Sequence, residues 1–201
     1  MRAVSAARRG GTRLRVLGIS GSLRRGSHNT ELLRAAAELL PPPAQLELFD
    51  GLKAVPPYDE DDDIGGGPDG ARELRGAIED ADAILIATPE YNSSVPGQLK
   101  NALDWASRPF PANALQGKPV AVVGASTGMF GAVWSQAEAR KALGSIGARV
   151  IDMDLPVPHA DEAFTDDGRL ADPELRERYA EILDELAALA EQFSESPRLA
   201  A

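Results

Sequence analysis

The sequence contains no cysteine among its 201 residues. This excludes disulfides, thiolate zinc sites, iron–sulfur clusters and thiol catalysis, so any redox chemistry must come from a bound cofactor. Basic residues are also in the minority, with 21 against 31 acidic ones and a net charge of -10. A chain of this charge repels the phosphates of nucleic acids and anionic membrane surfaces. We therefore expect neither nucleic acid nor a membrane among its partners.

Long apolar runs are lacking too, since no uninterrupted stretch approaches the ~20 residues that would span a bilayer. The hydrophobic fraction of 43% is nevertheless that of a globular protein, and 201 residues suit one domain. We expect a soluble, cytoplasmic protein with one domain at 14–195. We expect a disordered basic tail at 1–13, without the apolar core of a secretory signal, and a C-terminal tail at 196–201.

Short apolar runs mark the expected strands. The runs at 15–20, 83–88 and 119–125 lack polar alternation, as expected of strands covered on both faces of a parallel sheet. Two weaker strands are predicted at 45–49 and 149–153. Helical patterns fall between them and after them, so the chain alternates strand and helix.

Several residues mark where the expected helices begin. Asn29 can cap a helix that runs to Leu40, and Pro96 suits a first helical position. Further helices are predicted at 71–79 and 133–146, and a long one follows Asp172. These elements predict an α/β, flavodoxin-like three-layer sandwich: a five-stranded parallel sheet of order 2-1-3-4-5 with helices on both faces. Such sheets bind ligands at the carboxyl ends of their strands, so the loops there are the candidate site.

The first of these loops reads S-G-S-L-R-R-G-S-H-N-T and lies between the first strand and its helix. It combines four hydroxyls, the guanidinium of Arg24, one amide and the N–H groups of a helix N-terminus, which is how a phosphate is held without metal. These side chains belong to Ser20, Ser22, Ser27, Thr30, Arg24 and Asn29. The spacing fits neither a Walker nor a Rossmann motif. The alternative is an ordinary hydrophilic turn.

The second loop reads P-E-Y-N-S-S-V-P-G after the third strand. Tyr91 offers an aromatic surface and Asn92 a hydrogen-bonding amide, while Pro89 and Pro96 stiffen the backbone. A flat heterocycle would fit such a wall. Taken alone, the loop is equally compatible with proline and asparagine as ordinary turn residues and with Tyr91 as a packed core residue.

The third loop, A-S-T-G-M-F-G-A, follows the fourth strand. Ser126 and Thr127 present hydroxyls, and Gly128 lets the backbone approach a ligand. Met129 and Phe130 are expected to be packing residues.

Together these segments resemble the NADPH-dependent FMN reductase family, especially its bacterial quinone and chromate reductase branch. The resemblance runs from about Val16 to Val150 and rests on G-S-L-R-R-G-S-H-N, T-P-E-Y-N-S-S-V-P-G-Q-L-K-N-A-L-D-W and G-K-P-V-A-V-V-G-A-S-T-G-M-F-G-A, in that order. It implies that the first motif cradles the FMN phosphate, the second lies along the isoalloxazine ring and the third closes over the flavin. The candidate FMN-binding residues are Ser20, Ser22, Leu23, Arg24, Ser27, His28, Asn29, Thr30, Pro89, Glu90, Tyr91, Asn92, Ser126, Thr127 and Gly128.

The resemblance implies an FMN-dependent enzyme that takes a hydride from NADPH or NADH. Two electrons then pass to quinones or similar small acceptors, with chromate, azo compounds and free flavin as further options. Ala132 and Trp134 stand where the family commonly has a second glycine and a basic residue, which leaves the preference between NADPH and NADH open. The alternative is an electron-transfer or regulatory flavin-binding protein without reductase activity.

No catalytic side chain and no metal site is expected, because the flavin carries the chemistry. The acidic segment Asp59–Asp63 lacks EF-hand spacing and is interpreted as a solvated loop. The motif K-N-A-L-D-W resembles the helix through which family members dimerise, which implies a homodimer or homotetramer. Trp105 within it could equally be ordinary core.

Overall fold

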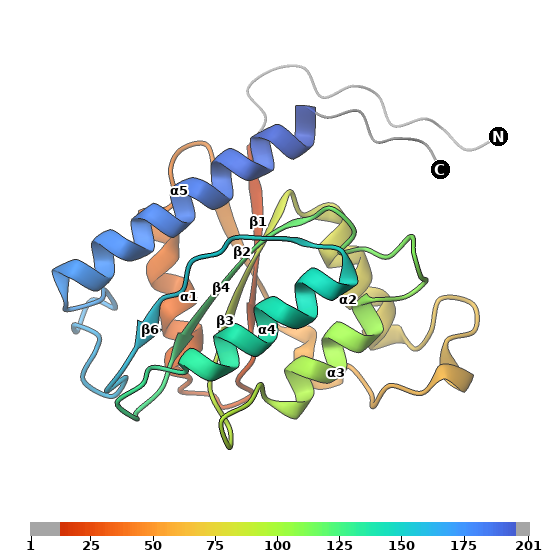
Figure 1. Ribbon diagram of the computed structural model, residues 1–201, viewed down its shortest axis with the longest axis horizontal. Coiled ribbons are helices and arrows are strands. Elements are labelled where there is room, and N and C mark those ends of the chain that lie inside the picture. The colour runs from red at the N-terminus through yellow and green to blue at the C-terminus, as the bar shows by residue number, and fades with distance from the viewer. Residues whose placement is uncertain (1–12, 196–201) are drawn as a thin grey trace.

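In the computed structural model, which describes residues 13–195, a parallel sheet forms the centre of the molecule (Figure 1). Its strand order is β2-β1-β3-β4-β5, and every neighbouring pair is parallel. The predicted order is therefore confirmed. The strands are β1 (Arg15–Ser20), β2 (Gln45–Phe49), β3 (Ala83–Thr88), β4 (Pro119–Ala125) and β5 (Arg149–Val150).

The edge of the sheet beyond β4 differs from the prediction. The expected strand at 149–153 ends at Val150, and a further strand, β6 (Pro156–Val157), pairs in parallel with the end of β4. Asp152 and Asp154 lie between the two short strands, and aspartate fits poorly in a pleated, half-buried sheet. Two short strands thus cover the edge where one longer strand was expected.

Helices cover both faces of the sheet (Figure 1), and residues 13–195 form five of them. The chain order also contains two 3-10 turns, η1 (Gly51–Ala54) and η2 (Glu60–Asp62), in the segment between β2 and α2. Helices α1 (His28–Leu39) and α5 (Pro173–Glu195) pack on one face, while α2 (Asp69–Asp80), α3 (Gly97–Ala106) and α4 (Val133–Ile146) pack on the other.

Each face of the sheet has its own hydrophobic core. On one face Tyr179 of α5 is fully buried, and its hydroxyl donates to the carbonyl of Leu32 at 3.0 Å. On the other face Trp105 of α3 is fully buried, and its indole N–H donates to the Pro56 carbonyl at 2.9 Å. Trp105 is therefore a core residue, which decides the alternative that its sequence context left open.

The helix starts confirm one cap prediction and correct two others. Asp172 caps α5, because its Oδ1 accepts from the N–H of Glu174 at 2.8 Å. Helix α1 is capped by Ser27 instead of Asn29, and Pro96 precedes α3 instead of beginning it. Serine and asparagine are both good N-caps, so local sequence does not distinguish them. The tails at 1–12 and 196–201 lie outside the described residues.

Candidate functional site

The three loops singled out in the sequence line one cavity of about 310 Å³ at the carboxyl ends of β1, β3 and β4. This volume lies at the small end of the usual range for ligand pockets. The cavity, called here the three-loop cavity, is lined by Ser22, Arg24, Ser27, His28, Asn29, Pro89, Glu90, Tyr91, Ala125, Ser126 and Thr127. Its position agrees with the rule that such sheets bind ligands beyond the ends of their strands.

The first loop is shaped by its own hydroxyl groups. The buried Ser27 accepts with Oγ from the N–H of Thr30 at 3.3 Å and so caps α1. The Thr30 hydroxyl donates to Ser20 Oγ at 3.0 Å, and Ser20 Oγ in turn accepts from the N–H of Ser22 at 3.4 Å. Ser20 and Thr30 therefore hold the loop together, whereas Ser22 and Ser27 lie in the cavity wall.

Positive charge and free N–H groups meet at this end of the cavity. Arg24 lines the cavity and is exposed, and its guanidinium makes no hydrogen bond or ion pair within residues 13–195. In the same part of the chain, the backbone N–H groups of His28 and Asn29 in the first turn of α1 also lack an acceptor. An unpaired guanidinium beside the open N-terminus of a helix is a donor set suited to a phosphate.

Asn29 joins the first loop to the third. Its amide nitrogen donates to the Ala125 carbonyl at 2.9 Å, and its amide oxygen accepts from the Ala125 N–H at 3.0 Å. The side chain is 3% exposed. Asn29 therefore fixes the distance between the phosphate-type loop and the end of β4, in addition to lining the cavity.

In the second loop, Glu90 turns its carboxylate toward α4. Its Oε2 accepts from the N–H groups of Trp134 and Ser135 at 3.0 and 3.2 Å. A carboxylate at this place satisfies two open donors and interacts favourably with the helix dipole. Thr88, just before the loop, adds a buried hydrogen bond to the Ser135 hydroxyl at 2.8 Å. The loop is thus anchored to α4.

The third loop is held by its backbone. Ser126 Oγ accepts from the N–H of Gly128 at 3.2 Å. Gly131 has φ +56, and a Cβ there would lie 2.5 Å from the carbonyl carbon of Pro156, so only glycine fits. Met129 and Phe130, expected to be packing residues, are 67% and 55% exposed, so that prediction is wrong. Both lie in a surface turn before α4, where the Phe130 ring meets the edge of Trp134 at a centroid distance of 4.8 Å and is still largely open to solvent.

Ten of the fifteen predicted residues line the three-loop cavity. The other five do not: Ser20, Leu23, Thr30, Asn92 and Gly128. Sequence reasoning missed Ala125, because its contribution comes from its position at the end of β4 and an alanine side chain carries no chemical signal. The assignment of these residues to a bound ligand remains a prediction.

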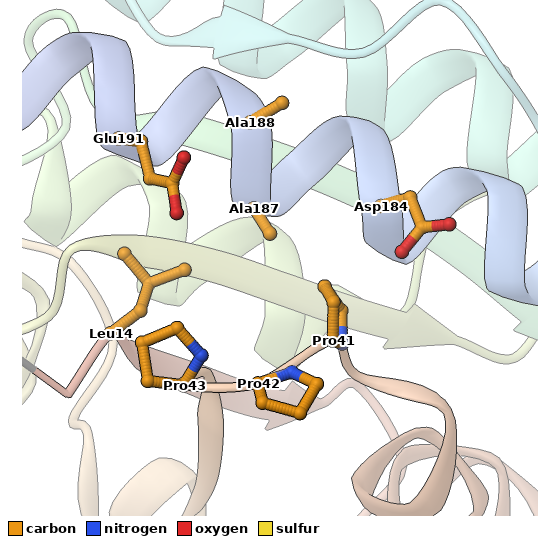
Figure 2. Close-up of a pocket in the computed structure, with 8 residues that line it drawn as sticks. All are labelled: Leu14, Pro41, Pro42, Pro43, Asp184, Ala187, Ala188 and Glu191. Atoms are coloured by element: carbon orange, nitrogen blue, oxygen red, sulfur yellow. The ribbon is translucent and has the colours of Figure 1, made fainter.

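Two other cavities are lined by different sets of residues. One of about 230 Å³ lies between α5 and Pro41–Pro43, where Asp184 and Glu191 of α5 face the prolines (Figure 2). Leu14, just before β1, also lines it, which places it at the opposite edge of the sheet from the three-loop cavity. None of the predicted site residues lines it.

The other cavity, of about 320 Å³, borders the three-loop cavity through His28. The imidazole stacks on Phe164 with centroids 6.4 Å apart, and its Nδ1 lies 3.0 Å from Glu31 Oε2. Within residues 13–195, no group of three or more histidine, aspartate or glutamate side chains is placed to hold a metal ion. No helix in this part of the chain is long and apolar enough to cross a membrane.

Comparison with known proteins gives the family. Residues 14–162 match the family described as NADPH-dependent FMN reductase. The chain belongs to this family. An NAD(P)H-dependent FMN reductase of Pseudomonas aeruginosa is 43% identical over 174 residues, covering 86% of this chain and 93% of the relative. A 2-hydroxy-1,4-benzoquinone reductase of a Burkholderia species is 35% identical over 176 residues, covering 87% and 95%.

The solved structures agree with this assignment of the FMN reductase family. The flavoenzyme NAD(P)H:(acceptor) oxidoreductase FerB of Paracoccus denitrificans superposes with a TM-score of 0.77 at 33% identity, over 89% of this chain and 98% of that one. The flavodoxin-like architecture predicted from the sequence is therefore confirmed.

Proposed function

We propose that this chain is an FMN-dependent NAD(P)H oxidoreductase that reduces quinones. The observation that carries the proposal is the union of three loops in one cavity, with a phosphate-type donor set at one end and an aromatic side chain in the wall. The FMN reductase family, the Pseudomonas relative and the benzoquinone reductase relative support the same activity.

The residues present fit FMN. Arg24 and the first N–H groups of α1 would hold the phosphate, because within residues 13–195 they are unpaired donors at or beside a helix N-terminus. The Ser22 hydroxyl, whose oxygen accepts from the Arg24 N–H at 3.4 Å, would donate a hydrogen bond of its own to the phosphate. Pro89 and Tyr91 would lie along the ring as a stiff, partly aromatic wall. When bound, FMN supplies the capacity to accept a hydride from a nicotinamide and to pass on two electrons.

The residues of the chain bind and orient the flavin and leave its ring accessible to the nucleotide and the quinone. The Glu90 carboxylate is hydrogen-bonded to the N-terminus of α4. Its negative charge is therefore compensated by the helix and is not left unpaired beside the flavin ring. Ser126 and Thr127 present polar groups at the opposite side of the cavity. No protein acid or base is required, and one open cavity serves the nucleotide and the quinone in turn.

The test follows the flavin of the purified, FMN-loaded chain under anaerobic conditions. NADPH or NADH should bleach its visible absorbance, and benzoquinone should restore it. Steady-state rates should show the parallel-line pattern of ping-pong kinetics. Bleaching by dithionite but by neither nucleotide would refute a reductase and leave a flavin-binding or electron-transfer protein.

The proposal also includes a homodimer or homotetramer. Large apolar side chains stand exposed on segments that border the three-loop cavity, and a second copy would remove them from water. They are Tyr91, Met129, Phe130 and Trp134. Light scattering at low protein concentration tests this, and a fully active monomer would refute it.

The proposed location is the cytoplasm, because the electron donor is a metabolite of the cell interior. Chromate, azo compounds and free flavin remain predicted further acceptors. Assays of the loaded enzyme with each acceptor in place of quinone test them.

A further inference from the structure

One carboxylate of α4 that the proposed mechanism does not use reaches across to the second loop. Glu138 Oε2 accepts a hydrogen bond from the hydroxyl of Ser94 at 2.6 Å and another from the N–H of Val95 at 3.2 Å. These two hydrogen bonds hold the pKa of Glu138 below its ordinary value, and the bond from the Ser94 hydroxyl has the larger effect. The positive charge of Lys141 lowers the pKa slightly further. The carboxylate is therefore charged and engaged at neutral pH.

The residues that Glu138 holds close a strained turn. Tyr91 and Ser94 exchange two backbone hydrogen bonds, from Tyr91 N–H to the Ser94 carbonyl at 3.0 Å and from Ser94 N–H to the Tyr91 carbonyl at 3.2 Å. Between them, Asn92 and Ser93 adopt φ +54 and φ +60, although neither is glycine. Left-handed backbone is unfavourable for such residues, so this turn needs support from outside itself.

The other end of the segment is fixed separately. Glu90 is bonded to the first N–H groups of α4, as described above. Tyr91 follows directly, is 52% exposed and lines the three-loop cavity. The position of Tyr91 therefore depends on two attachments of the second loop to α4. Glu90 makes the attachment before the turn, and Glu138 makes the one after it.

We propose that Glu138 is a positioning residue: by holding Ser94 and Val95 against α4, it keeps the turn closed and Tyr91 in place as the wall for the flavin ring. This inference rests on the proposed function, because the wall has its purpose only with FMN in the cavity. Glu138 itself does not line the cavity, so it acts through the turn and not by contact with the cofactor.

The test uses the full chain and three variants. Glu138→Ala removes both hydrogen bonds, whereas Glu138→Gln keeps a side-chain oxygen that can accept them. Glu73→Ala is the matched control, because Glu73 is an exposed glutamate within α2 and makes no hydrogen bond or ion pair among the described residues. Apoprotein of each variant is titrated with FMN and with riboflavin, and the absorption spectrum of the bound flavin is recorded.

Glu138→Ala should bind both flavins more weakly by roughly threefold to tenfold, the equivalent of about one hydrogen bond. The loss should be equal for FMN and riboflavin, because Tyr91 faces the ring and not the phosphate. The bound flavin should show a shifted visible spectrum. Glu138→Gln should restore affinity and spectrum, and Glu73→Ala should match the parent chain in both.

Hydrogen exchange of the apoprotein supplies a readout that needs no cofactor. The peptide containing the turn should exchange faster in Glu138→Ala than in Glu138→Gln. Unchanged affinity, spectrum and exchange in Glu138→Ala would refute the proposal, and so would a general loss of stability in urea without rescue by Gln. Failure of the unsubstituted chain to bind FMN would overturn the proposed function itself. That result is distinguishable from a failure of the present proposal, which is tested only by comparing the variants with the unsubstituted chain.

Discussion

Arg24 gives the sharpest test of how the site recognises its ligand. The side chain is exposed, lines the three-loop cavity and has no partner within residues 13–195. If it pairs with the FMN phosphate, Arg24→Ala should weaken FMN binding and leave riboflavin binding almost unchanged. Riboflavin has the same ring without the phosphate, so the ratio of the two dissociation constants isolates the charge.

The magnitude follows from the exposure of the guanidinium. Two unit charges about 4 Å apart attract by roughly 1 kcal/mol in water and roughly 4 kcal/mol near a protein surface. A hydrogen bond to a charged group contributes about 1.5 to 3 kcal/mol. Because Arg24 is open to solvent, we use the range of about 1.5 to 3 kcal/mol for its interaction with the phosphate, and not the larger energy of a buried ion pair. This range corresponds to a loss of roughly tenfold to hundredfold in FMN affinity.

Fluorescence titration of apoprotein measures both flavins in one buffer, and the FMN loss should shrink as salt is raised. Arg25→Ala is the control, because Arg25 is also exposed but does not line the cavity. It should change neither constant more than slightly. Equal losses of FMN and riboflavin in Arg24→Ala would mean that the loop is only structural and that the phosphate assignment is wrong.

Three further substitutions test what supports the site and the fold, each by urea unfolding. Asn29→Ala should lower the free energy of unfolding by about 2 kcal/mol, because both backbone groups of Ala125 lose a buried partner. Arg75→Leu should lower it by roughly 2 to 3 kcal/mol, because the buried guanidinium bonds the Asp63 carboxylate at 3.0 Å and a main-chain carbonyl of α3 at 2.9 Å. Tyr179→Phe should lower it by only about 1 kcal/mol, since a single hydrogen bond is lost and the ring still packs.

The parts of the fold that local patterns determine were predictable from the sequence. The strands at 15–20, 45–49, 83–88 and 119–125 have the predicted bounds, because short apolar runs bounded by loops leave little freedom in their ends. The helix at 133–146 also has the predicted bounds. The short strand after it was wrong, because β5 is set by how far β4 can pair and its own sequence signal is weak.

The candidate site was predictable at the level of its loops but not of its individual contacts. The loops follow strands whose ends meet, so their convergence follows from the topology. The partner of Asn29 lies 96 residues away, and the partners of Glu90 lie 44 and 45 residues away. No local pattern encodes contacts of this range, so the bracing roles of both side chains appear only in the folded chain.

Alanine stands at position 132, although the backbone there has a left-handed conformation that favours glycine. Ala132 has φ +63, a left-handed conformation that is unfavourable by about 1 to 2 kcal/mol for an L-residue with a side chain. Its methyl group is buried and lies 3.0 Å from where a Cβ on Gly124 would be, so it occupies space that glycine leaves on β4. The turn at Ala132 also starts α4, and the first N–H groups of α4 donate hydrogen bonds to the Glu90 carboxylate. Burial of the methyl group and capping of α4 by Glu90 thus offset the backbone strain at Ala132. The methyl group fits because Gly124 has no side chain that would occupy the same space.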